Sequence, residues 1–145
     1  MAKRGRWTQS EFIPKNPSKC LNQGKISSRS SWEHSYMRWL DEHPDVLEWG
    51  SEVVAIPYFN PLKKRPAKYY PDFIIRYKDK NNVIHNELIE IKPLKETMME
   101  HAKSKYDRMM LISNAAKWKA AQSWCRRAGM VFRIVNEHHL FRGRR

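Results

Sequence analysis

The sequence lacks any apolar run that approaches the length of a membrane-spanning helix, which needs about 20 apolar residues. We also expect no signal peptide, because the basic segment Met1–Arg6 has no hydrophobic region behind it. We therefore expect no membrane partner. Cysteine is scarce, and Cys20 and Cys125 form no metal-ligand pattern, which indicates a reducing compartment such as the cytoplasm.

Acidic residues are few as well. The chain has 15 Asp and Glu against 28 Lys and Arg, a formal net charge of +13. Such a surplus is the electrostatic signature of a protein that binds nucleic acid. The 6 histidines show no zinc spacing, and no internal repeat or base-reading module is visible, so any DNA recognition should be of phosphates and shape.

The length of 145 residues and the 41% hydrophobic content are enough for one compact domain with a modest core. Residues 1–28 are rich in Lys, Arg, Ser, Pro and Asn and have few apolar anchors. We interpret them as a basic N-terminal arm, which could follow a phosphate backbone or merely aid solubility. Residues 29–145 are expected to form the single domain.

The periodicity of apolar residues within this domain predicts a mixed α/β fold. A first helix is expected from Ser30 to about Glu42, where Pro44 blocks its continuation. The remaining elements are expected to be strands at Leu47–Pro57, Lys68–Tyr77 and Val83–Lys92, helices at Glu96–Leu111 and Ala115–Ala128 with a break at Ser113-Asn114, and a strand at Met130–Val135.

The second and third of these strands bring charged residues together. The polar segment between them favours a turn, and a hairpin centred near Asn81 pairs residues that are equally distant from it. Asp72 then faces Glu90. Because side chains alternate along a strand, Lys92 shares the face of Glu90, while Ile91 points to the other face.

Two carboxylates and an ammonium group in this arrangement suit phosphodiester hydrolysis. Mg²⁺ prefers oxygen ligands, which Asp72, Glu90 and the carbonyl of Ile91 could supply, and it makes a water molecule more acidic. The alternative is that Glu90 and Lys92 are solvated charges on an edge strand. We favour the catalytic interpretation because Leu88, Ile89 and Ile91 predict a strand that is buried on both faces. Charged side chains in such a strand need partners or a metal.

Further candidates have two interpretations each. Glu33 follows Ser30 at capping-box spacing, but it could also project toward the sheet as a metal ligand, and spacing alone favours the cap. Glu52 could approach the same cluster. The candidate DNA contacts in a Pro-bounded basic loop are Lys63, Lys64, Arg65 and Lys68. Those on one face of the last helix are Lys119 and Gln122, for which a merely solvated face is the alternative.

Glu33 on the first helix, Pro71-Asp72 and Glu90-x-Lys92 together resemble the PD-(D/E)xK nuclease superfamily. Within it, four segments resemble the head-completion nucleases of contractile-tailed bacteriophages. They are S-x-W-E at Ser30–Glu33, W-G-S-E-V-V-A-I-P-Y at Trp49–Tyr58, E-I-K-P-L-K-E-T at Glu90–Thr97 and K-W-K-A-A-Q at Lys117–Gln122. The resemblance spans about residues 28–137. The order of motifs is also similar to that of transposon-end endonucleases.

The resemblance implies a nuclease-like mixed sheet flanked by helices, in the order α-β-β-β-α-α-β. It implies a DNA endonuclease that uses Mg²⁺, with Mn²⁺ as a substitute and no small-molecule cofactor, in phage head completion. Its catalytic residues would be Glu33, Asp72, Glu90 and Lys92, of which the three carboxylates bind metal together with the Ile91 carbonyl. The expected partners are DNA and the portal or other head-completion proteins, in the host cytoplasm during assembly or in the virion. The alternatives are a non-catalytic DNA- and portal-binding protein, or a transposon-end or junction-resolving nuclease.

Overall fold

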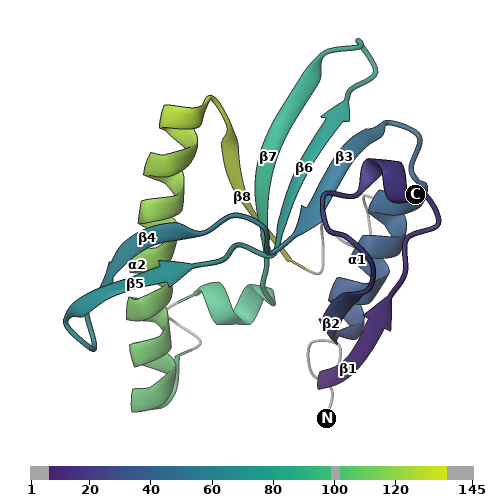
Figure 1. The fold of residues 1–145 in the computed structure, drawn as a ribbon. Helices are drawn as coiled ribbons and strands as arrows, with labels where there is room; N and C mark the ends of the chain where they lie inside the picture. The colour runs from purple at the N-terminus through teal and green to yellow at the C-terminus, as the bar shows by residue number, and fades with distance from the viewer. Residues whose placement is uncertain (1–6, 99–101, 137–145) are drawn as a thin grey trace.

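The computed structural model describes residues 7–98 and 102–136 and shows a four-stranded mixed sheet between two helices (Figure 1). The sheet has the order β3 (Val46–Ser51), β6 (Phe73–Lys78), β7 (Ile84–Ile91), β8 (Val131–Val135). β8 is parallel to β7 and the other pairs are antiparallel. None of the helices in the described residues is long and apolar enough to cross a membrane.

The register of β6 and β7 is the one that the hairpin pattern predicts. Phe73 pairs with Ile89 and Lys78 pairs with Ile84, so each pair is equally distant from Asn81. The turn is held by Asp79, whose side chain accepts hydrogen bonds from the backbone N–H groups of Asn81 and Val83. Asn82 adopts a positive φ of 62°, a conformation that asparagine tolerates well. This register fixes the relative positions of Asp72 and Glu90.

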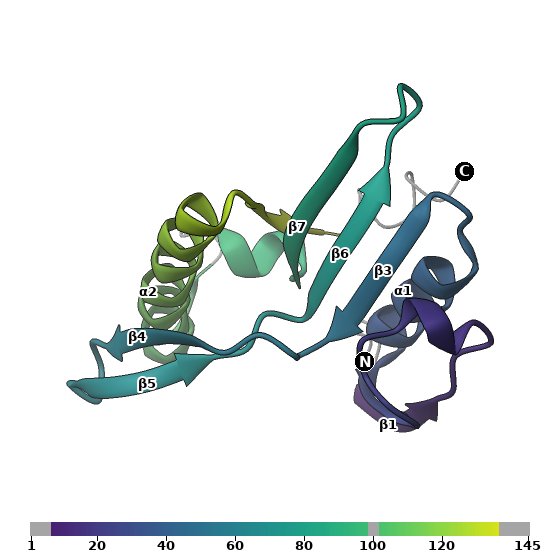
Figure 2. The same ribbon diagram turned by 45° about the horizontal axis from the view of Figure 1, so that its top comes forward.

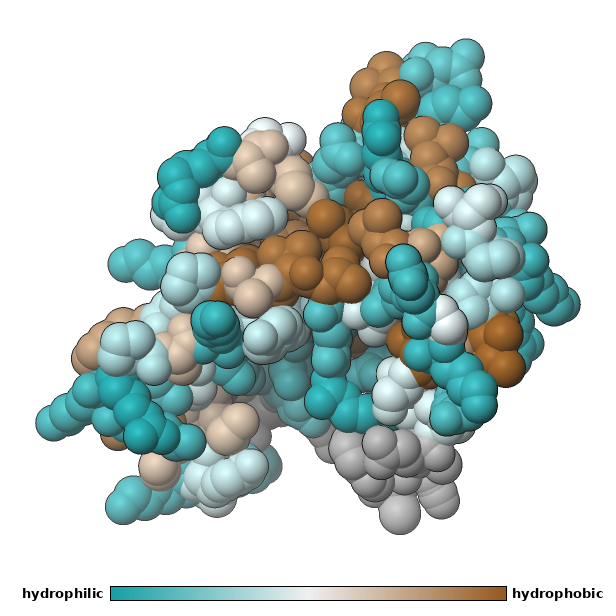
Figure 3. Space-filling view, viewed as in Figure 1, coloured by the Kyte–Doolittle hydropathy of each residue, from teal (hydrophilic) through white to brown (hydrophobic). Residues whose placement is uncertain are grey.

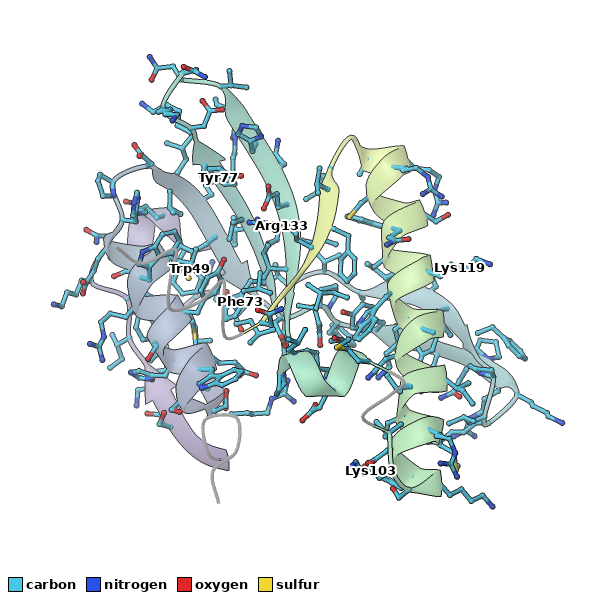
Figure 4. All side chains as sticks on the ribbon, turned by 180° about the vertical axis from the view of Figure 1, so that it is seen from behind. Trp49, Phe73, Tyr77, Lys103, Lys119 and Arg133 are labelled. Atoms are coloured by element: carbon cyan, nitrogen blue, oxygen red, sulfur yellow. The ribbon has the colours of Figure 1, made fainter. Side chains whose placement is uncertain are left out.

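One face of the sheet packs against α1 (Ser31–Glu42), and the other packs against α2 (Lys105–Ala128). The fully buried Met37 and Leu40 of α1 meet Trp49 and Phe73 of the sheet, which Figure 4 labels. On the other face, Leu88 packs with Ala121 and Cys125 of α2, together with Ile56 and Tyr69. The alternation along β7 therefore directs Glu90 toward α2 and Ile89 toward α1.

The expected N-terminal arm is not confirmed over residues 7–28. β1 (Trp7–Phe12) pairs with β2 (Ile26–Ser30), and the connection between them contains the short 3-10 helix η1 (Pro17–Lys19). Phe12 and Ile26 are buried in the core, and Asp41 of α1 accepts hydrogen bonds from the backbone N–H groups of Lys15 and Asn16. The few apolar residues of the segment are enough to anchor it. The basic residues of Met1–Arg6 and of 141–145 lie outside the described residues.

The expected strand at Leu47–Pro57 is two strands, β3 and β4 (Ile56–Asn60), because Glu52 has a φ of 53°, which an extended strand cannot contain. Likewise, Lys68–Tyr77 divides at Pro71 into β5 (Arg65–Tyr69) and β6. β4 and β5 form a two-stranded ribbon that lies along α2 and extends away from the sheet (Figures 1 and 2).

The expected helical region after the sheet also differs. It begins with the 3-10 helix η2 (Leu94–Thr97), and α2 then starts at a Ser104 cap, whose Oγ accepts from the N–H of Asp107. The break expected at Ser113-Asn114 is wrong, because α2 is continuous there. Both side chains are buried, so packing overrides the weak helix preference of serine and asparagine. The helix ends at Gly129, with φ 72°, as expected.

Candidate active site

The predicted catalytic residues meet where β6 begins and β7 ends. Asp72 directly precedes β6, Glu90 is the next-to-last residue of β7, and Lys92 follows it. Glu33 reaches the same place from the first turn of α1. These side chains line one open cavity of about 410 Å³. Residues from β2, the β3–β4 connection, the ribbon, the end of β7 and α2 complete its lining, among them Arg29, Glu52, Lys68, Tyr69, Ile91 and Lys117.

Asp72 and Glu90 form a pair of carboxyl groups that repel each other. The Oδ2 atom of Asp72 accepts a hydrogen bond of 2.7 Å from the backbone N–H of Ile91, which locks it against the end of β7. Burial raises the pKa of Asp72 well above its usual range, and the charges of Glu90 and Glu33 raise it further. Burial also raises the pKa of Glu90, whose side chain is almost inaccessible to solvent. A cation bound between the two groups would favour the ionised form of both.

Glu90 is oriented by Tyr69 and by two lysines. The hydroxyl of Tyr69 donates a hydrogen bond of 2.6 Å to its Oε1 atom, and Lys92 Nζ lies 4.0 Å from its Oε2 atom. Lys117 approaches from α2, with its Nζ 5.9 Å from the centre of the Tyr69 ring. Burial lowers the pKa of Lys117, although the charge of Glu90 opposes that effect. Neither Tyr69 nor Lys117 was predicted from the sequence as a site residue.

Glu33 caps the helix as predicted and also reaches the cavity. Its backbone N–H donates to Ser30 Oγ at 3.1 Å, which is the expected helix cap. Its Oε1 atom accepts from the backbone N–H of Arg29 at 3.1 Å, so the carboxylate is held at the start of α1. From there it lines the cavity and contributes to the raised pKa of Asp72. Capping and membership of the acidic cluster are therefore compatible.

Glu52 also reaches the cavity, as its position suggested. Its carboxylate forms an ion pair with Arg29, and its backbone N–H donates to the carbonyl of Asp72 at 3.1 Å. Burial raises the pKa of Glu52, which the charge of Arg29 partly offsets. The ion pair leaves Glu52 less available for a metal than Asp72 or Glu90. The backbone hydrogen bond from Glu52 joins the β3–β4 connection to Asp72, the residue that precedes β6.

The predicted DNA contacts divide into two groups. Lys63 and Lys64 lie in the turn of the ribbon, and Arg65 and Lys68 lie on β5. All four side chains are exposed, and Lys68 lines the cavity. Hydrophilic side chains cover the tip of the ribbon in Figure 3. Lys119 and Gln122 are exposed on α2 but do not line the cavity, and Lys119 points away from the sheet in Figure 4.

The donor set of the cavity fits a hard divalent cation that keeps part of its shell of water or phosphate oxygens. Asp72, just before β6, and Glu90 of β7 supply carboxylate oxygens, and burial is the main cause of their raised pKa values. Among the residues that the structure describes, no three His, Cys, Asp or Glu side chains are close enough to hold a metal by themselves. Mg²⁺ suits this incomplete set, because it is usually bound through one or two carboxylates plus substrate phosphate.

Residues 43–137 match the family model of the N-terminal domain of TnsA-like endonucleases. The chain belongs to this endonuclease family. It is also 37% identical over 151 residues to the head completion nuclease of Enterobacteria phage T4, in an alignment that covers 97% of this chain and 95% of the phage protein. The predicted relationship to head-completion and transposon-end endonucleases is thereby confirmed. The family model includes Asp72, Glu90 and Lys92, whereas Glu33 precedes it and falls only within the longer alignment.

Proposed function

We propose that this endonuclease hydrolyses phosphodiester bonds of DNA with Mg²⁺, or Mn²⁺ in its place, during phage head completion. The observation that carries this proposal is the meeting of the partly buried Asp72 with the buried Glu90, both with raised pKa values, and with Lys92 Nζ 4.0 Å from Glu90. Like charges placed together with little access to solvent cost stability, and such pairs with perturbed pKa values are concentrated at functional sites. The net charge of +13 and the family membership support DNA as the substrate.

In this proposal each side chain of the cavity has a separate task. A divalent cation bound there would lower the pKa of water and so supply the attacking hydroxide near neutral pH. Asp72 and Glu90 hold that cation, with the Ile91 carbonyl and Glu33 as further oxygen donors. Tyr69 fixes the orientation of Glu90 through its hydrogen bond. Lys92 orients the nucleophile and, with Lys117, stabilises the negative charge that develops on the phosphate.

The direct test is cleavage of supercoiled and linear DNA by the purified protein, with Mg²⁺, with Mn²⁺ and with EDTA. We expect nicked or linear products with either metal and none with EDTA. DNA binding without any cleavage would contradict the proposal and favour the non-catalytic, portal-binding alternative. A stable dimer that prefers four-way junctions would instead favour a junction-resolving enzyme, which must cut two strands symmetrically.

The ribbon of β4 and β5 supplies the proposed backbone contacts, because it carries exposed basic residues outward from the cavity. We expect the double variant Lys63→Ala/Lys64→Ala to bind duplex DNA more weakly at low salt. The slope of log K against log salt should fall by about 0.9 for each phosphate that the variant no longer neutralises. A fluorescence anisotropy titration at several salt concentrations would measure both effects.

The matched control removes the same charge at the opposite end of the sheet. Lys78 ends β6 and Lys80 lies in the turn that follows it, far along the strand from Asp72. Lys78→Ala/Lys80→Ala should therefore leave the slope nearly unchanged. Equal losses of affinity in the two double variants would mean that DNA is held by overall charge, with no special role for the ribbon.

We also propose that the protein acts in the host cytoplasm during assembly, or in the virion, beside portal or other head-completion proteins. The similarity to the phage nuclease over nearly the whole chain supports this setting. Co-purification of the chain with filled heads, tested against heads assembled without it, would check the association. Absence from heads at every stage of assembly would contradict it.

A further inference from the structure

A second cavity, of about 440 Å³, adjoins the catalytic cavity between η2 and the N-terminal half of α2. Lys92 lines both cavities, so the two are neighbours at the lysine proposed to act on the phosphate. The family membership and the proposed chemistry assign no role to this second space, which we call the α2 groove. Its walls include Met98, which follows η2, and Tyr106, Met110 and Asn114 of α2.

Four of the α2 residues that line the two cavities form one stripe. Tyr106, Met110, Asn114 and Lys117 are separated by four, four and three residues, and this spacing places them on one face of an α-helix. The rise of about 1.5 Å per residue sets Tyr106 roughly 16 Å from Lys117 along the helix axis. The stripe thus leads from the catalytic cavity toward the start of α2.

The chemistry of this stripe suits a nucleobase. Tyr106 is 69% exposed, and the side chain of Met110 lies one turn further along. Aromatic side chains and thioethers offer contact to flat rings. Asn114 is only 6% exposed and lines the groove, where it is the amide side chain of the lining. An amide offers both a donor and an acceptor, which match the hydrogen-bonding groups on the edge of a base.

The charges in the groove favour a base over a phosphate group. Glu96 and Asp107 are the acidic residues of its lining, and Asp107 Oδ2 already accepts from the backbone N–H of Lys103 at 3.2 Å. Carboxylates repel phosphate, but they accept hydrogen bonds from the amino groups of bases. The phosphates would remain beside Lys92 and Lys117 while the base enters the groove.

We propose that the α2 groove binds the base of an unpaired nucleotide next to the phosphate that is cut. The enzyme would then prefer DNA with a single-stranded tail or unpaired segment at the cleavage position over fully paired duplex. This inference rests on the proposed function, because it takes the shared Lys92 as part of the nuclease centre. It specifies the class of DNA that this centre accepts.

The experiment compares a fully paired linear duplex with the same duplex carrying an unpaired segment. The ratio of their kcat/KM values is measured with Mg²⁺, and the ratio of their Kd values is measured by anisotropy in EDTA, where no cleavage occurs. We expect the wild type to favour the unpaired DNA by about tenfold in both ratios, the order of one stacked base. Tyr106→Ala and Asn114→Ala should bring both ratios close to one, whereas Tyr106→Phe should keep them.

The matched control is Ile112→Ala, which removes an exposed apolar side chain of α2 that does not line the groove. It should keep both ratios. Equal treatment of the two DNAs by the wild type would overturn the inference. So would preserved ratios in Tyr106→Ala and Asn114→Ala, which would leave the groove to a protein partner. Absence of cleavage with a preserved binding preference would contradict the proposed function alone.

Discussion

Replacing Asp72 by asparagine is expected to reduce DNA cleavage by about three orders of magnitude or more without loss of the fold. The substitution removes the charge of a proposed metal ligand, and metal assistance contributes several kcal/mol, where each 1.36 kcal/mol is about tenfold in rate. The amide oxygen of asparagine can still accept the hydrogen bond from Ile91 N–H, which spans 2.7 Å in the wild type. Initial rates of plasmid nicking by the two proteins, with Mg²⁺, measure the loss.

The same variant is expected to be more stable than the wild type at neutral pH without metal. The pKa of Asp72 is raised above its ordinary 3.8 on folding, so the folded state binds protons more tightly than the unfolded state. Its contribution to stability is therefore fully present below pH 3.8 and is lost as the pH rises through the raised value. Asparagine resembles the protonated carboxyl group, so the melting temperatures should coincide in acid and diverge as the pH rises.

Metal should reverse this difference. Mg²⁺ or Mn²⁺ that binds only the folded wild type raises its melting temperature by mass action. The Asp72→Asn variant should respond much less. Thermal melts at several pH values, with EDTA and with each metal, provide the measurement. The support for a metal centre at Asp72 would be lost if the variant were inactive because it no longer folds. It would also be lost if neither metal changed the melting temperature of the wild type.

The pairing of Asp72 with Glu90 could be predicted because it depends on local features alone. Two β-rich stretches and a turn-forming segment centred near Asn81 determine the register, and strand alternation then places Lys92 beside Glu90. The cap at Ser30 was predictable for the same reason. Interactions within one hairpin or one helical turn need no knowledge of the tertiary fold.

The residues that were missed depend on how α2 packs. Lys119 and Gln122 were chosen as the DNA-facing side chains, whereas Lys117 is the lysine that faces the cavity. Two residues differ by about 200° around a helix, so Lys117 and Lys119 lie on opposite sides. A signal was available: Lys117 precedes Ala121 by four residues, on the face expected to join the core. A lysine on such a face suggests a partner, and here the partner is Glu90.

Replacing Lys92 by methionine is expected to lower the cleavage rate by about 100-fold to 1,000-fold, the range found when one group that stabilises transition-state charge is removed. Methionine keeps most of the apolar stem and removes the ammonium group that lies 4.0 Å from Glu90 Oε2. The backbone N–H of Lys92 still donates to the carbonyl of Val135. Binding of duplex DNA should therefore change far less than the rate, which single-turnover kinetics can separate.

Lys117→Met and Lys119→Met test whether the effect of Lys92→Met depends on a position in the cavity or on the loss of a positive charge. If both lysines of the cavity act on the phosphate, Lys117→Met should also reduce the single-turnover rate, by about tenfold to 100-fold because its role is proposed to be secondary. Lys119→Met removes the same charge from the exposed side of α2 and should affect only binding at low salt. If Lys119→Met slowed the chemical step as much as Lys92→Met, the reduced rates would reflect net charge, and neither cavity lysine could be assigned to the reaction.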